Sequence, residues 1–302
     1  MALCLPPIRH TPIRQTPIPQ TKARRILSPT AGFVAEAGST HSLTPARNCT
    51  YSCAYCYVPT LGIYGGLKPE DWRSWGRFTT FKTNAAALLL GELRPDQTIY
   101  CSPLVDPYQP AEGDQRQMPG VLGAVCESPP RVFVLQTRGL LILRDLGRLQ
   151  DLRNRTALRV SFSIPTDRDD VLKLYEPRSP SFAARLDVLR ALRQTGFEVY
   201  ATLAPILPCD PENLAGAVRE ASGRDPIGDP LHVRAVKRHG ATTRQAHSEC
   251  VVRVNKAAFR IAEKQGQTDW LDAAFQDEIF ALIRRVGPAF ETGPRGFARL
   301  AV

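Results

Sequence analysis

The chain has 302 residues, of which 43% are hydrophobic, so it can bury a full core as one large α/β domain or two small ones. It contains no apolar run of about 18 residues and no apolar leader, so we expect neither a membrane-spanning helix nor a signal peptide. The net charge of +10 is carried by the ends: residues 1–47 and 231–302 each have a net of +5, and residues 48–230 are balanced. We therefore expect a cytoplasmic protein without membrane contact, whose thiols stay reduced.

The first 30 residues contain six prolines and five basic residues but no acidic residue. Such a composition cannot build a core, so we predict a flexible, basic, proline-rich arm over residues 1–30. Basic ends around a neutral body favour an anionic partner, with nucleic acid as the first candidate. Solvated tails without a partner are the alternative.

From residue 31 onward, patterns typical of strands and helices alternate along the chain. Strands are predicted at residues 97–101, 131–136, 157–164 and 197–205, and helices at residues 80–93, 140–152, 181–194 and 211–221. This alternation is typical of βα units around a parallel sheet. The units are too few for a closed eight-stranded barrel, so we predict a partial barrel over residues 31–230. Residues 231–302 are predicted to form a basic segment and C-terminal helices, with helical character over 251–286.

Three cysteines, Cys49, Cys53 and Cys56, have the spacing C-x3-C-x2-C in a loop expected after a short first strand. Thiolates at this spacing can converge on one metal centre, and soft thiolates suit zinc or iron–sulfur clusters. Structural zinc normally has four protein ligands, and no fourth Cys or His follows at the expected spacing. Three ligands on a four-iron cluster would leave one iron open to an exogenous ligand. Zinc binding and simple burial of the thiols are the alternatives.

With Tyr55 in its aromatic position, this pattern resembles the defining motif of the radical S-adenosylmethionine (SAM) superfamily. The resemblance implies a [4Fe-4S] cluster on Cys49, Cys53 and Cys56, in a partial (β/α)6 TIM-like barrel of the radical SAM type. It also implies that SAM binds the open iron and is cleaved by one electron to methionine and a 5′-deoxyadenosyl radical, which abstracts hydrogen from the substrate. The electron would come from an external donor such as flavodoxin or ferredoxin.

Further segments resemble the spore photoproduct lyase branch of the superfamily, including the radical SAM proteins called DNA repair photolyases. The matching stretches are residues 75–76, 82–84, 106–112, 136–138, 160–164 and 176–178, of which 106–112 is the most specific. The resemblance implies that Ser163 and Arg138 hold the carboxylate and ribose of SAM. Lysine is usual at the second place, so Arg138 departs from the pattern, although a guanidinium can bind a carboxylate through two hydrogen bonds.

Three more residues are predicted to bind the cofactor: Tyr55, Ser102 and Asp106. For Asp106, which precedes a proline, a role as a turn residue is the equal alternative. Spore photoproduct lyase uses a cysteine as hydrogen donor on a strand after the cluster loop, with tyrosines beside its cluster motif. By this resemblance Cys101 and Tyr57 are predicted to be catalytic. The alternative for Cys101 is a buried core residue, which is the usual position of a free cysteine.

A basic segment from His232 to His247 contains no acidic residue and holds three of the five histidines. It favours a loop whose contacts with phosphates would position a nucleic acid, with a solvated loop as the alternative. We therefore predict a monomeric radical SAM enzyme that acts on nucleic acid, in the form of thymine photolesion repair. Radical SAM modification of a tRNA, peptide or small metabolite is the main alternative, and a zinc-stabilised nucleic-acid-binding module is the third.

Overall fold

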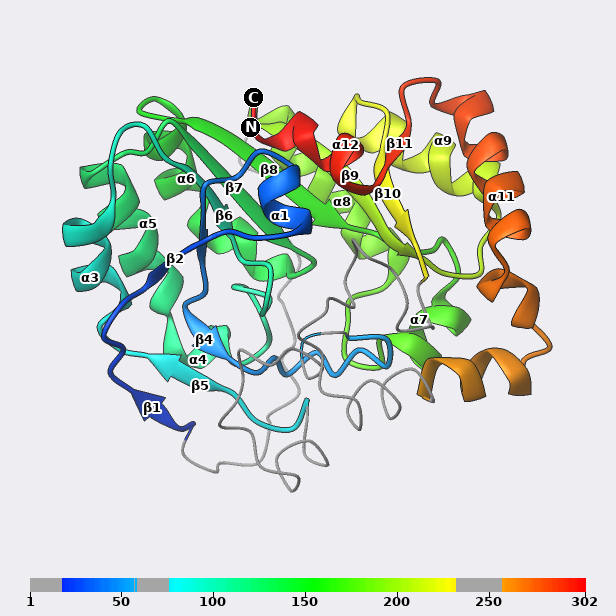
Figure 1. Cartoon of the computed structure of the whole chain (residues 1–302), viewed down its shortest axis with the longest axis horizontal. Coiled ribbons are helices and arrows are strands. Elements are labelled where there is room, and N and C mark those ends of the chain that lie inside the picture. The colour runs from blue at the N-terminus through cyan, green and yellow to red at the C-terminus, as the bar shows by residue number, and fades with distance from the viewer. Residues whose placement is uncertain (1–17, 57, 59–75, 232–256) are drawn as a thin grey trace.

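The computed structural model describes residues 18–56, 58, 76–231 and 257–302. Its main sheet has eight strands in the order β11-β10-β9-β8-β7-β6-β3-β2 (Figure 1). These strands are β2 (Leu27–Pro29), β3 (His41–Leu43), β6 (Thr98–Cys101), β7 (Val132–Thr137), β8 (Ala157–Ser163), β9 (Glu198–Ile206), β10 (Ile227–Pro230) and β11 (Glu291–Thr292). Neighbouring strands run parallel, except that β2 and β3 are antiparallel.

Strands β3, β6, β7, β8, β9 and β10 follow one another in chain order within the sheet, with helices between them. This is the partial (β/α)6 barrel of the prediction. The helices are α3 (Ala85–Glu92), α5 (Gln117–Glu127), α6 (Leu146–Arg153), α8 (Phe182–Gln194), α9 (Pro211–Ser222) and α11 (Ala273–Val286). Figure 1 shows them around the outside of the strands. Caps fix their ends: the Asp210 side chain accepts from the backbone N–H of Asn213 at the start of α9, and Gly223, with φ of 73°, follows its last residue.

The central strands are buried on both faces, because helices cover one face and the barrel interior the other. In β7, Phe133 and Leu135 pack in the core cluster that includes the helices. Their neighbours Val132 and Val134 pack in a second cluster inside the barrel. Continuous hydrophobic runs of this kind are typical of parallel sheets, and the two-residue period decides which side chains enter the barrel.

The C-terminal residues fill one end of the barrel interior. Short helices α1 (Phe33–Glu36), α12 (Gly293–Phe297) and η5 (Ala298–Leu300) lie on the inner side of the sheet, and Phe297 and Leu300 pack against Tyr100 and Tyr200 there (Figure 1). The predicted C-terminal extension is therefore part of the barrel, to which it also adds strand β11.

The predicted N-terminal arm, residues 1–30, is too long. Strand β1 (Gln20–Thr21) joins β5 (Thr80–Lys82) and β4 (Ala46–Arg47) in a small sheet, and β2 belongs to the main sheet. These short strands have few apolar residues of their own, so long-range pairing forms them and composition does not reveal them. Residues 1–17 of the predicted arm lie outside the described residues.

Three predicted helices differ in their bounds. The expected helix at 80–93 begins with strand β5, and its helical part starts only at Ala85, because Asn84 binds the backbone of Ala23 through both ends of its amide. The expected helix at 140–152 starts as a 3-10 helix, η3 (Leu140–Asp145), and continues as α6. Within 251–286, residues 257–264 and α11 are helical, and a break with Gly266 at φ of 62° separates them.

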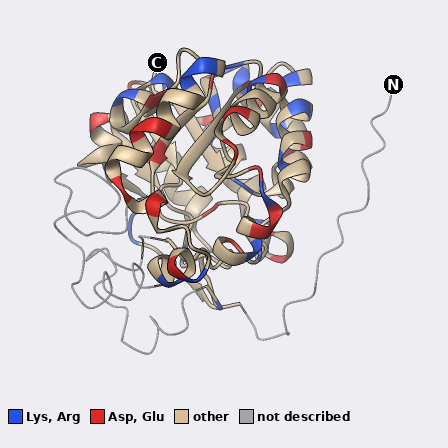
Figure 2. Ribbon diagram, turned by 90° about the vertical axis from the view of Figure 1, so that its right-hand side faces the viewer, with Lys and Arg blue, Asp and Glu red and all other residues tan. Residues whose placement is uncertain are grey.

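Charges of both signs are intermixed over the helices of the described body (Figure 2). The predicted basic segment from His232 to His247 lies outside the described residues. Among the helices in the described ranges, none is long and apolar enough to cross a membrane.

Candidate functional site

The three cysteines of the motif lie in the loop that follows strand β4, and all three are half-buried. The loop turns through two left-handed residues, Asn48 with φ of 62° and Ser52 with φ of 60°. It contacts segments that follow β6, β7 and β8, so it covers the C-terminal end of the barrel strands. In barrels of parallel strands, catalytic groups gather at this end.

The segment after β6 supports one side of the cluster loop. Gln109 accepts from the backbone N–H of Thr50 at 2.8 Å, and its amide nitrogen donates to the carbonyl of Asn48 at 3.4 Å. The hydroxyl of Tyr51 donates to the carbonyl of Tyr108 at 3.1 Å. A Cβ on Gly139 would overlap that carbonyl, so the close approach requires glycine. The most specific stretch of the sequence resemblance is thus a support for the cysteine loop.

The last residue of α7 (Asp169–Tyr175) and the segment after it support the other side. The carbonyl of Tyr175 accepts from the backbone N–H of Ala54 at 2.8 Å. Arg178 donates to the carbonyls of Gly76 at 2.7 Å and Thr50 at 3.4 Å. Gly76, at φ of 82°, approaches Ser52 so closely that any side chain would collide with it. Two polar segments far apart in the sequence therefore hold the cysteine loop in place.

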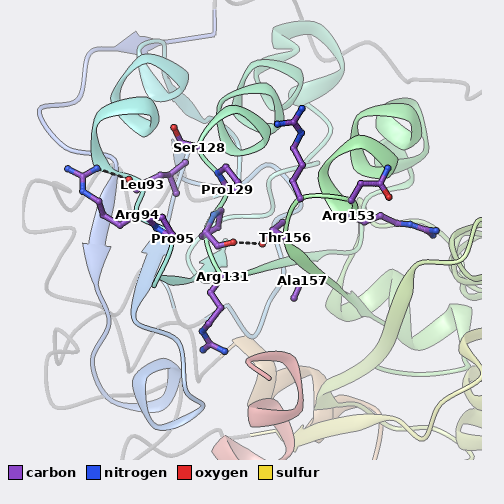
Figure 3. A pocket seen from close by; sticks show the side chains of 12 residues that line it. Leu93, Arg94, Pro95, Ser128, Pro129, Arg131, Arg153, Thr156 and Ala157 are labelled. Carbon is purple, nitrogen blue, oxygen red and sulfur yellow. Dashed lines mark hydrogen bonds between the residues drawn. The ribbon is translucent and has the colours of Figure 1, made fainter.

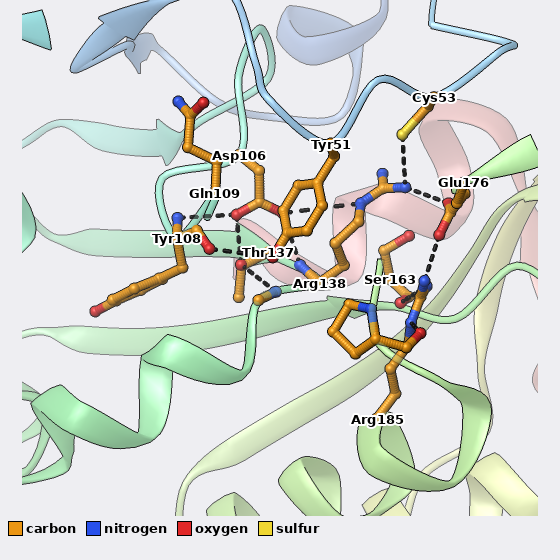
Figure 4. A network of polar contacts seen from close by, with 12 residues as sticks. Tyr51, Cys53, Asp106, Tyr108, Gln109, Thr137, Arg138, Ser163, Glu176 and Arg185 are labelled. Atoms are coloured by element: carbon orange, nitrogen blue, oxygen red, sulfur yellow. Dashed lines mark hydrogen bonds and ion pairs between the residues drawn. The ribbon is translucent and has the colours of Figure 1, made fainter. Parts of the chain in front are cut away.

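Beneath the loop lies a row of alternating charges, Asp106, Arg138, Glu176 and Arg185 (Figure 4). Glu176 and Arg185 are fully buried, and Glu176 accepts from both arginines and from the hydroxyl of Tyr55. Burial alone would raise the pKa of Glu176, but the attraction of Arg138 and Arg185 and its hydrogen bonds lower that pKa to about 2. Glu176 is therefore favoured in its ionised form and pairs with both arginines.

Asp106 ties the ends of two strands together. Its carboxylate accepts from the backbone N–H of Tyr108 at 2.9 Å, the hydroxyl of Thr137 at 2.6 Å and the backbone N–H of Arg138 at 2.8 Å. Burial raises its pKa, against the opposing effect of Arg138. These contacts fit the role of a turn residue, which was the alternative for Asp106. They also hold the backbone of Arg138 in place.

Arg138 lies directly beside the motif cysteines. One terminal nitrogen of its guanidinium, Nη1, is 3.2 Å from Cys53 Sγ and 2.8 Å from the hydroxyl of Tyr55, and it also contacts Glu176. Burial would lower the pKa of Arg138, but Cys53, Glu176 and Tyr55 raise that pKa well above its ordinary value. Arg138 and Tyr55, both predicted to bind the cofactor, thus lie together beside Cys53. Their grip on SAM stays a prediction.

Two predicted cofactor residues carry buried hydroxyls with no hydrogen-bond partner among the described residues. They are Ser102, directly after β6, and Ser163, the last residue of β8. An unpaired buried hydroxyl costs free energy, so such groups are expected where a ligand supplies the partner. The carbonyl of Ser163 accepts from Arg185, the partner of Glu176 (Figure 4). The polar residues at this end of the barrel fit a cofactor with several hydrogen-bonding groups, as SAM has.

The three motif thiols lie close enough together to act on one another electrostatically: Cys56 contributes to the raised pKa of Cys49 and of Cys53, and Cys49 contributes to that of Cys53. Burial, followed by the charge of Asp106, raises the pKa of Cys49 to about 12, so a metal centre would supply the charge that holds these groups as thiolates. Within the described ranges, no group of three or more His, Cys, Asp or Glu side chains could hold one metal ion. Three neighbouring thiolates fit a four-iron cluster, in which each binds a different iron.

The predicted catalytic role of Cys101 is not supported by its position. Its side chain is fully buried in the core cluster between sheet and helices, while Tyr100 before it faces the barrel interior. A hydrogen donor must reach the substrate, so this cysteine has the position of a core residue. Tyr57, the other predicted catalytic residue, lies outside the described residues.

Sequence reasoning gave no role to Gln109, Glu176, Arg178 and Arg185. The first three stand in stretches that carried the family resemblance, so that resemblance was the available signal. Arg185 had no such signal: it lies on a strongly periodic helix and reads as a surface arginine. Only the fold brings its guanidinium to Glu176 and to the carbonyls of Ser163 and Pro180.

A pocket of about 780 Å³ lies at the opposite end of the barrel, before β6, β7 and β8. Four arginines line it, Arg94, Arg131, Arg153 and Arg155, and Figure 3 shows the three that are labelled extending in different directions. It contains none of the predicted site residues. The chemistry is therefore expected at the cysteine end.

The fold and the site together define a class: an enzyme with a partial parallel barrel whose C-terminal end carries three cysteines above buried polar residues. The family model of the Radical SAM superfamily matches residues 43–215. The chain belongs to this superfamily, and membership implies a [4Fe-4S] cluster and SAM as cofactors.

Curated relatives and solved structures are similar to the chain over different lengths. An uncharacterized protein of Mycobacterium tuberculosis is 31% identical over 166 residues, which is 54% of this chain and 48% of the relative. One of Methanocaldococcus jannaschii is 27% identical, over 62% of this chain and 66% of the relative. The chain thus spans about half the length of the mycobacterial relative it matches. Spore photoproduct lyase complexed with dinucleoside spore photoproduct has a TM-score of 0.55 at 14% identity, over 90% of this chain and 80% of that one. This last likeness shows the fold.

Proposed function

We propose that this radical SAM enzyme abstracts hydrogen from a nucleic acid, and that repair of a thymine photolesion is its specific activity. The observation that carries the chemistry is the convergence of the motif cysteines, Arg138 and the unpaired hydroxyl of Ser163 at the C-terminal end of the barrel. In the proposed reaction, Cys49, Cys53 and Cys56 hold the cluster. Ser163 and Arg138 hold SAM, and Ser102 and Tyr55 complete the pocket around it.

Support for a nucleic-acid substrate comes from sequence and charge. Stretches that resemble the spore photoproduct lyase branch make up both supports of the cysteine loop, through Gln109 and Arg178. Residues 232–256 carry six basic residues and one acidic residue. A lesion within a duplex must be exposed before chemistry, and basic segments can hold the backbone while this happens.

The test uses anaerobically reconstituted protein, SAM, a reductant and UV-irradiated or spore-photoproduct-containing DNA. We expect 5′-deoxyadenosine to form on reduction and the lesion to revert to thymine only when SAM is present. The matched control is Cys53→Ala, which removes a cluster ligand and should abolish both products. If 5′-deoxyadenosine forms while the lesion persists, the class stands and the repair activity is rejected.

The position of Cys101 favours a second candidate. Spore photoproduct lyase returns hydrogen through a cysteine on the corresponding strand, and here that cysteine is buried in the outer core. Modification of a tRNA, a peptide or a small metabolite needs no such donor. Incubation with total tRNA, followed by nucleoside mass spectrometry with and without SAM, distinguishes this candidate from lesion repair.

A further inference from the structure

Arg138 donates a hydrogen bond to the sulfur of Cys53, which is one of the three predicted cluster ligands. Its Nη1 lies 3.2 Å from Cys53 Sγ, within the range of N–H···S hydrogen bonds to a thiolate. A donor to a ligating sulfur withdraws electron density from the iron, and hydrogen bonds to sulfur are a main determinant of cluster potential.

Two acidic residues hold Arg138 at this contact, and a second arginine holds one of them. The backbone N–H of Arg138 donates to Asp106 at 2.8 Å, and its guanidinium is paired with Glu176. Glu176 is in turn held by Arg185, which is fully buried and also donates to the carbonyl of Ser163 at 3.0 Å. The position of Nη1 relative to Cys53 is therefore set by contacts within the protein.

The charges in this row act on the cluster with opposite signs. Asp106 and Glu176 are acidic and Arg138 and Arg185 are basic, so their formal charges cancel when all four are ionised. Arg138 is the member in hydrogen-bond contact with Cys53, and Glu176 lies behind it. A reduced cluster carries one more negative charge than an oxidised one, so the nearest cation favours reduction and the acid behind it opposes reduction.

We propose that Arg138 sets the reduction potential of the [4Fe-4S] cluster through its hydrogen bond to Cys53, with Glu176 and Arg185 as the residues that position it. The step is a one-electron transfer: an external donor of the flavodoxin or ferredoxin class is oxidised, the cluster goes from the 2+ to the 1+ state, and no proton moves. The inference rests on the proposed function only for the presence of the cluster and is independent of the substrate.

The experiment is an EPR-monitored redox titration of anaerobically reconstituted protein without SAM or substrate, with signals normalised to bound iron. We expect Arg138→Gln to lower the equilibrium constant for reduction by about ten-fold, a downward shift of about 59 mV for one electron. Glu176→Gln is expected to shift the potential upward, because it leaves the charge of Arg138 less compensated. Arg138→Lys keeps the charge and should give an intermediate value.

The matched control is Arg190→Gln, the same substitution at an arginine paired with Glu220 on the outer, solvent-exposed side of α8. The proposal is overturned if Arg138→Gln leaves the potential within the spread of this control, or if Arg138→Gln and Glu176→Gln shift it in the same direction. If Arg138→Gln fails to bind iron, the signs for Arg138→Lys and Glu176→Gln decide. Lesion reversal is not measured here, so a wrong substrate proposal leaves this result standing.

Discussion

The two ends of the barrel are built from the same strands but are filled in different ways. At the N-terminal end of the strands, the interior holds apolar and aromatic side chains, among them Val132, Tyr200 and Ile227, closed by Phe297 and Leu300 from the end of the chain. At the C-terminal end, the same strands deliver Ser102, Arg138 and Ser163, and the interior holds charges and unpaired hydroxyls.

This difference shows how one strand can serve stability and chemistry at once. In β8, Ala157 packs in the apolar cluster, Arg159 pairs with Glu198 at 2.7 Å, Ser161 binds the hydroxyl of Thr202 at 2.6 Å, and Ser163 is unpaired. The residue of this face nearest the cysteine loop, Ser163, is thus the one whose hydroxyl lacks a partner within the described residues. Apolar burial at one end stabilises a barrel whose other end keeps groups that only a ligand would satisfy.

The largest effect on folding is expected from Arg185→Met. It removes one partner of a fully buried ion pair with Glu176 and should cost about 3 kcal/mol of unfolding free energy, the size typical of broken buried pairs. Urea unfolding of the reconstituted protein measures this. Arg190→Met, at an exposed pair, is the control and should change stability by less than about 0.5 kcal/mol. Equal losses of unfolding free energy in the two variants would show that the buried ion pair contributes no more to stability than an exposed pair.

Phe297→Ala tests the opposite end. Phe297 is buried and packs edge-on against Phe33 with ring centroids 5.0 Å apart, so its truncation should cost about 3 kcal/mol. The EPR signal of the reduced cluster and its response to SAM are expected to remain those of the unaltered protein. A changed EPR signal in the folded variant would show that packing at one end of the barrel affects the cluster at the other end.

Ser163→Ala should weaken SAM binding by about ten-fold, since one hydrogen bond to a charged group is worth roughly 1.5 kcal/mol. Unfolding free energy without SAM should not decrease, because the substitution removes a buried hydroxyl that has no partner within the described residues and so costs free energy. Ser161→Ala is the matched control: it loses its hydrogen bond to Thr202 and should reduce stability without reducing SAM affinity. Equilibrium binding of SAM to the reconstituted protein and urea unfolding give the two readings.

The smallest effect is a pH dependence from Lys82, whose ammonium donates to the carbonyl of Thr44 at 2.6 Å near the cysteine loop. Burial, together with Arg47, lowers the pKa of Lys82 to about 8. Between this value and the ordinary 10.5, the unfolded chain binds the proton that the folded chain has lost, so stability should rise with pH in this window. Lys82→Met should lack this component of the rise. Identical slopes for the two proteins over that window would contradict the assignment.

Much of the fold was predictable from local sequence. Buried runs such as residues 131–136 and the periodic helix at 181–194 gave elements of the right type, because hydrophobic period reports which face is covered. Strands β1 and β5 were missed since two or three residues carry no period, and they exist only through pairing with distant partners. The same limit applies to the C-terminal residues, whose packing inside the barrel depends on a cavity formed by other strands.

The sequence by itself determined the chemistry of the cysteine loop, because three thiolates at C-x3-C-x2-C spacing with Tyr55 lie within one short segment. Only the tertiary structure decided what surrounds that loop. The strand register turned Cys101 outward into the core and Tyr100 toward the barrel interior, since neighbouring side chains in a strand face opposite sides. The packing of α8 brought Arg185 to Glu176, and so fixed Arg138 beside Cys53. Contacts between residues far apart in the chain leave no local pattern, and the charges of this site are arranged by such contacts.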